Sequence, residues 1–144
     1  MKRYLNFIRL SFAEKSLLVE SLFLVTFISL ALRIIPFRFL KKALAPRSAT
    51  EVRQKPVDWK KINSIARSVS LVSRFVPFAT CLPQALAAMF LIKARGQHSD
   101  LKIGVAKGEG KDFRAHAWLE TNGRIIIGEV PSNWQYKVLD SLFK

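Results

Sequence analysis

Apolar and polar positions follow different patterns in the two halves of the chain. Apolar residues recur at helical spacing in the first half, whereas the second half contains short strand-like runs. Leu5–Leu32 predicts one long helix or two short ones, and Pro36 ends this region because proline cannot continue a helix. Within it, Ser21–Leu32 is twelve residues long and carries no charge. Spanning a bilayer takes about 20 apolar residues, so this run predicts a buried or interfacial helix.

The start of the chain shares one feature with secretion signals, because Met1-Lys2-Arg3 is basic. Against a signal peptide, the apolar run begins late and follows Glu14 and Glu20. Further along, Lys41–Lys55 is rich in charge and is followed by Pro56, which predicts a loop or linker.

Two more helices are predicted in the middle of the chain. Asp58 is suited to cap a helix that runs to about Phe75. The apolar face of this helix is formed by Trp59, Ile62, Ile65, Ala66 and Val69. Thr80 is placed to cap the next helix, which starts at Cys81 and ends near Gly96. Its apolar residues at helical spacing are Leu82, Ala85, Leu86, Met89 and Phe90.

Strands follow the helices. The predicted strands are Leu101–Ala106, Phe113–Glu120 and Arg124–Glu129. Asn122-Gly123 lies between the last two and is the strongest short signal for a two-residue hairpin turn. Helices followed by antiparallel strands predict the α+β class.

Charge is distributed unevenly along the 144 residues, whose formal net charge is +14. Residues 1–80 hold 15 Lys and Arg against 4 Asp and Glu, and residues 81–144 hold 9 against 6. A basic excess predicts an acidic partner, which could be a peptide, a lipid surface or a nucleic acid. Nucleic acid is disfavoured because the basic residues are dispersed and no binding motif accompanies them. Solubility alone is the simpler explanation of the charge.

Cys81 is the single cysteine, so the chain cannot form an internal disulfide and gives no sign of an oxidising compartment. The N-terminus of a helix lowers the pKa of a cysteine, and its free N–H groups can bind an oxyanion. These properties make Cys81 a candidate nucleophile. A buried free cysteine is more often a small apolar residue, so this position is not sufficient by itself.

His116 is the candidate base, because a polar ring in the middle of a predicted strand must find a partner; a lone histidine in such a place is more often structural. Alternation along that strand predicts that His116, Trp118 and Glu120 share one face. The other histidine, His98, follows Gly96 in a loop and is given no role.

The predicted hairpin supplies a carboxylate for His116. If Asn122 and Gly123 form the turn, cross-strand partners have numbers that add to 245. The resulting pairs are Thr121–Arg124, Glu120–Ile125, Trp118–Ile127 and His116–Glu129. Glu129 would then fix the tautomer of the imidazole, and Glu120 is the second choice. A slip of one residue would place Gly128 there instead.

The motifs together resemble one family, the lasso-peptide leader peptidases, which are transglutaminase-like cysteine proteases of lasso-peptide biosynthesis. The resemblance covers roughly residues 70–130. It rests on Cys81-Leu82-Pro83-Gln84-Ala85-Leu86, Gly96, Leu101-Lys102-Ile103-Gly104-Val105, Phe113-Arg114-Ala115-His116-Ala117-Trp118-Leu119-Glu120, Gly123 and Ile127-Gly128-Glu129. The family's acid is commonly an Asp near this last point, so Cys81 and His116 match the motif and Glu129 departs from it.

The resemblance implies both a fold and an activity. Residues 1–56 would form a basic helical extension with a linker. Residues 57–144 would form the transglutaminase/papain-like peptidase core, with the cysteine helix packed on a small antiparallel sheet. The enzyme would remove the leader from a ribosomally made precursor before a separate cyclase closes the macrolactam. Short members of the family work in the cytoplasm with a separate leader-binding protein, and the resemblance implies neither a cofactor nor a metal.

Two other classes of function remain open. One is an acyl transferase or transglutaminase of the same fold, in which an amine replaces water. The other is a non-enzymatic basic module that binds peptides or makes peripheral contact with a membrane.

Overall fold

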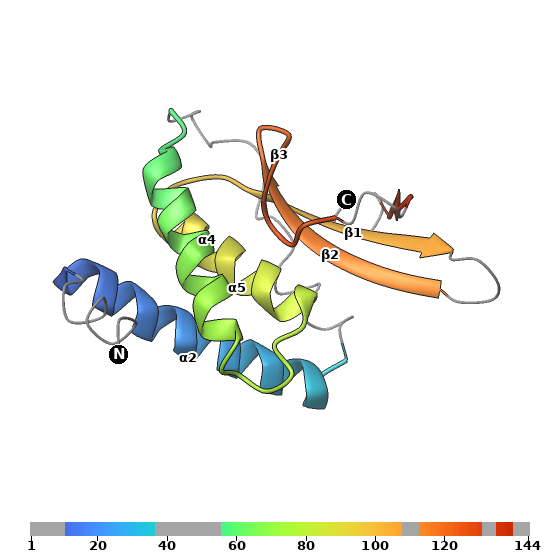
Figure 1. The fold of residues 1–144 in the computed structure, drawn as a ribbon, viewed down its shortest axis with the longest axis horizontal. Coiled ribbons are helices and arrows are strands. Elements are labelled where there is room, and N and C mark those ends of the chain that lie inside the picture. Colours follow the sequence, from blue (N-terminus) through green and yellow to red (C-terminus); the bar gives the residue numbers. More distant parts are fainter. Residues whose placement is uncertain (1–10, 37–55, 108–112, 131–134, 140–144) are drawn as a thin grey trace, which may run out of the picture.

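A computed structural model describes residues 11–36, 56–107, 113–130 and 135–139. Three helices come first within these ranges: α2 (Phe12–Ile34), α4 (Trp59–Ser73) and α5 (Cys81–Ala94). Four strands follow: β1 (Asp100–Lys107), β2 (Phe113–Thr121), β3 (Arg124–Ile127) and β4 (Lys137–Val138). The strands form an antiparallel sheet in the order β3-β2-β1-β4, and the helices gather on one side of it (Figure 1). The predicted α+β class is confirmed.

Helix α2 is longer than its charge-free segment. Ser11 and Glu14 form a capping box, in which each side chain accepts from the backbone N–H of the other residue. The helix ends just before Pro36, as predicted. Within the described ranges, α2 is the one helix long and apolar enough to cross a membrane by length and composition. The mean hydropathy of its most apolar 18-residue window is 2.1, and 22% of that window is buried.

Helix α4 begins at the predicted cap. The Asp58 carboxylate accepts a hydrogen bond from the backbone N–H of Lys61 at 3.1 Å. That bond is the main reason why the pKa of the Asp58 carboxyl is below its usual value. The buried residues Ile62, Ile65 and Val69 confirm the predicted apolar face.

Helix α5 begins at Cys81, as predicted. Thr80 is the N-cap residue, as predicted, but its side chain makes no capping hydrogen bond; its backbone carbonyl accepts from the N–H of Gln84 at 3.3 Å. At the other end, the chain turns at Gly96, whose N–H bonds to the carbonyl of Lys93 at 2.9 Å. Phe90, expected on the apolar face, is 38% exposed.

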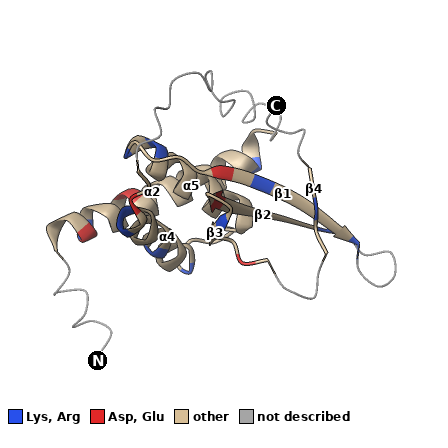
Figure 2. Cartoon of the chain, turned by 90° about the horizontal axis from the view of Figure 1, so that it is seen from above, with Lys and Arg blue, Asp and Glu red and all other residues tan. Residues whose placement is uncertain are grey.

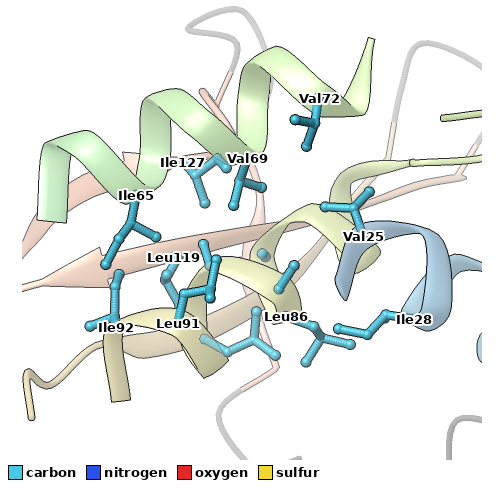
Figure 3. Close-up of a cluster of buried hydrophobic side chains, with 14 of the residues drawn as sticks. Val25, Ile28, Ile65, Val69, Val72, Leu86, Leu91, Ile92, Leu119 and Ile127 are labelled. Carbon is cyan, nitrogen blue, oxygen red and sulfur yellow. The ribbon is translucent and has the colours of Figure 1, made fainter. Parts of the chain in front are cut away.

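The core lies between the helices and the sheet. Helix α2 packs against α4 and α5, and those two helices pack against the strands. Figure 3 shows the side chains that meet there, which include Val25, Ile28, Ile65, Val69, Leu86, Ile92, Leu119 and Ile127. Helix α2 therefore shares one hydrophobic core with the elements that follow it. The segment 37–55 lies outside the described residues, and it contains the whole of the predicted Lys41–Lys55 linker, just before the boundary expected between residues 56 and 57.

Candidate active site

Cys81 is the first residue of α5, and its thiol is free and half-buried. It packs against the edge of the hydrophobic core. The loop before it is held by the Gln84 side chain, whose Nε2 donates to the carbonyl of Ala79 at 2.7 Å. Phe78 in the same loop has φ of 67°, a conformation that bulky residues rarely adopt and that often occurs at functional sites. The loop that leads to Cys81 is therefore held in a defined conformation.

The hairpin turn forms as predicted. Asn122 and Gly123 have φ of 49° and 75°, as a type I′ turn requires. The pairs Thr121–Arg124 and Glu120–Ile125 are confirmed.

The register changes beyond those two pairs. A bulge between Leu119 and Glu120 places Ile127 opposite Leu119, so the predicted pairs Trp118–Ile127 and His116–Glu129 are wrong. The physical reason is burial. The shift turns Ile127 onto the face that packs against the helices, where it is only 5% exposed.

The contact expected between His116 and Glu129 is made instead with the backbone of Gly128. The Nε2 atom of His116 lies 3.3 Å from the carbonyl oxygen of Gly128. A carbonyl can only accept, so this contact is a hydrogen bond when Nε2 carries the proton. Nδ1 then keeps its lone pair and is free to act as a base. Glu129 follows the end of β3 and is exposed.

The backbone at Gly128 leaves no room for a side chain. Its φ is +82°, and a Cβ there would lie 2.7 Å from the carbonyl oxygen of Ala117 and 3.0 Å from Cα of Trp118. The glycine thus lets the end of the hairpin lie directly over β2. Glycine inside a strand pattern often marks a bulge or a close backbone approach, so Ile127-Gly128 did carry a signal for this feature.

We expect Gly128→Ala to destabilise the protein by about 2 kcal/mol or more, because it adds a steric clash to the strain of a positive φ. Gly123→Ala is the matched control: its φ is +75°, but nothing lies within 4 Å of a Cβ there. The control should lose only about 1 kcal/mol. Urea denaturation measures both values, and equal losses would contradict the close contact at Gly128.

Aromatic rings surround His116 on its face of the sheet. The ring centroid of Trp118 lies 6.2 Å from that of His116, and that of Tyr136 lies 5.7 Å away. Trp118 is only 5% exposed, and it lies over Gly104 of the neighbouring strand. Trp118 therefore forms a wall beside His116. Tyr136 could not be found from the sequence, because β4 pairs with β1 rather than with its neighbour in the chain.

Glu120 has a different partner from the one considered for it. Its carboxylate accepts a hydrogen bond from Nε1 of Trp118 at 2.6 Å. This short bond fixes the indole next to His116. In the structure, Glu120 therefore positions the Trp118 indole and does not contact the His116 imidazole.

Cys81 and His116 lie on packed elements, since α5 packs against β2. Alternation along β2 turns Ala117 and Leu119 toward the helices, because both belong to the shared core, and places His116 on the other face. Within the described part of the chain, no hydrogen bond joins the Cys81 thiol to His116. The structure therefore does not bring the thiol and the imidazole together, because α5 covers the face of the sheet opposite to His116. The pairing of Cys81 with His116 stays a prediction.

Among the described residues, the other titratable groups form no second site. His98 is exposed and pairs with Asp100 at 3.1 Å. Across the described ranges, no three His, Cys, Asp or Glu side chains are grouped so that they could hold a metal ion. Glu109 and Asp112 lie outside the described residues.

Comparison with known proteins assigns the family. A family model described as the transglutaminase-like superfamily matches residues 23–141. The match covers most of the chain and includes α5, β2 and the hairpin. Comparison with curated proteins and with solved structures gave no match.

Proposed function

Because the chain belongs to the transglutaminase-like superfamily, we propose that it is a cysteine peptidase that removes the leader from a lasso-peptide precursor before macrolactam closure. The superfamily includes cysteine proteases and acyl transferases. The observation that carries the proposal is the position of the single cysteine, Cys81, at the first residue of α5. The motif from Phe113 to Glu120 adds the specific resemblance to leader peptidases.

Cys81 is the proposed nucleophile. Its thiolate, formed when the base takes the proton, attacks the scissile carbonyl and forms a tetrahedral intermediate. Free N–H groups in the first turn of α5 would bind the oxyanion. The intermediate collapses to a thioester and releases the amine of the new N-terminus.

His116 is the proposed base and acid. It takes the thiol proton and then gives a proton to the leaving amine. In the second half of the reaction it deprotonates the water that hydrolyses the thioester, which frees the leader carboxylate and the Cys81 thiol. The Gly128 carbonyl would support this role, because it can accept a hydrogen bond from Nε2 and so favours the tautomer whose Nδ1 keeps its lone pair.

The proposed partners follow from the same resemblance. They are the precursor leader, a separate leader-binding protein and the lasso cyclase, all in the cytoplasm. The basic character of the chain suits an acidic peptide partner. Lysines and arginines are present on both helices and strands (Figure 2), and part of the basic excess, including Lys41, Lys42 and Arg47, lies outside the described residues.

The test is a cleavage assay with the full chain, a synthetic precursor and the leader-binding protein, read by mass spectrometry. Hydrolysis gives a leader that ends in a free carboxylate. Acyl transfer would instead give a leader joined to an added amine, such as a lysine-rich peptide. A chain that bound the leader without producing either product would be a binding module, and the proposal would be wrong.

The structure changes what is expected of the two glutamates. Glu129 is exposed and follows the strand, so Glu129→Gln should reduce kcat/KM by less than about tenfold. Glu120→Gln weakens the charged bond to Trp118 and should cost more, about ten- to a hundredfold. Both variants are compared in one cleavage assay. A larger loss for Glu129→Gln would mean that Glu129 reaches His116 during the reaction.

A further inference from the structure

Helix α2 carries a large apolar surface that the fold leaves uncovered. On this helix Phe23 is 70% exposed, Phe27 60% and Ile34 82%. Its other exposed large apolar residues are Phe12, Val19, Leu22 and Leu30. Single apolar residues on a surface are ordinary, but a continuous patch marks an interaction site.

The exposed residues form one stripe. Val19, Phe23 and Phe27 are four residues apart, and Leu30 and Ile34 continue the same face. The rings of Phe23 and Phe27 stack with centroids 6.2 Å apart. No charged residue interrupts the helix between Glu20 and Arg33.

The opposite face of α2 is already occupied. Val25 and Ile28 are 0% and 4% exposed and pack against α4 and α5 (Figure 3). Glu20 is also tied to the domain by an ion pair with Arg95 at 2.8 Å. A helix that crosses a bilayer needs an apolar surface all round, whereas α2 offers lipid one face. Its geometry fits a helix that lies in the plane of a membrane surface.

The charge of the protein indicates which kind of partner could bind to this stripe. The net charge of +14 opposes contact between two copies. Arg33 lies in the last turn of α2, at the end of the stripe, and the chain as a whole is strongly basic. Basic residues beside an apolar helix face bind anionic headgroups while the apolar side chains enter the acyl boundary.

We propose that the exposed stripe of α2 docks the protein on an anionic lipid surface. Docking would also place the reactive helix near the membrane. The guanidinium of Arg33, at the end of α2, lies 3.5 Å from the ring centroid of Phe78 in the loop that leads to Cys81. The inference does not depend on the proposed peptidase activity, because binding is measured without cleavage.

The experiment compares binding of three proteins to vesicles by co-sedimentation. The vesicles contain phosphatidylcholine and phosphatidylglycerol at a ratio of about 3:1, or phosphatidylcholine alone, because anionic headgroups should strengthen binding. The test variant is Phe23→Asp with Phe27→Asp. The matched control is Phe113→Asp in β2, where the phenylalanine is 75% exposed on another element. All three proteins should fold, which thermal unfolding checks.

We expect the unaltered chain to bind the anionic vesicles and the double variant to bind at least about tenfold more weakly. The control should bind as the unaltered chain does, and all binding should weaken on vesicles without phosphatidylglycerol. Equal binding by the double variant and the control would overturn the proposal. So would a dimer, seen by light scattering, that the double variant dissociates while the unaltered chain ignores vesicles. An unaltered chain that binds a purified leader-binding protein through Phe23 but ignores vesicles would also overturn it.

Discussion

Replacing Cys81 with alanine should lower leader release by about 10⁴-fold or more, because no other thiol in the chain can form the thioester. The side chain is half-buried at a helix start, so the loss of one sulfur should change the free energy of unfolding little. The assay is the mass-spectrometric cleavage assay, run beside a urea denaturation of the same protein. Cys81→Ser is the matched variant, since its hydroxyl keeps the shape but ionises far less readily.

Two results of that experiment are informative. A Cys81→Ala protein that still binds the leader-binding protein would show that the loss lies in the chemical step. A Cys81→Ala protein that still releases the leader would show that the nucleophile assignment is wrong.

Replacing His116 with alanine should lower kcat/KM by about 10²–10⁴-fold, the usual contribution of a positioned base. It should also slow the alkylation of Cys81 by iodoacetamide at neutral pH, because the thiolate loses its counter-ion. His98→Ala is the control, because His98 is exposed and pairs with Asp100. The alkylation rate reports directly on whether His116 and Cys81 interact, which a purely structural role in the sheet would not affect.

The alkylation result also tests the placement of His116 on the face of β2 away from the core. An unchanged rate in His116→Ala would mean that the two side chains remain apart. In that case the contact between His116 and Gly128 would be structural. A slower rate would mean that the imidazole does interact with the Cys81 thiol, and that His116 lies nearer the start of α5 than the alternation along β2 indicates.

Local sequence determined much of the fold. Asp58 caps α4 and α5 starts at Cys81, as predicted. Capping residues and the spacing of apolar residues determine where a helix starts through interactions between residues only a few positions apart. The Asn122-Gly123 turn forms with both residues at positive φ for the same reason. The resemblance identified the transglutaminase-like family, which the match over residues 23–141 confirms.

Tertiary packing decided the rest. The bulge between Leu119 and Glu120 forms because Ile127 is buried in the core, and that burial depends on helices distant in sequence. As a result, His116 contacts the carbonyl of Gly128 instead of the predicted carboxylate of Glu129. Packing also decided which face of the apolar helix α2 is covered by α4 and α5 and which stays exposed. Turns and caps are set by neighbours in the chain, whereas register and exposure are set by what the completed core can bury.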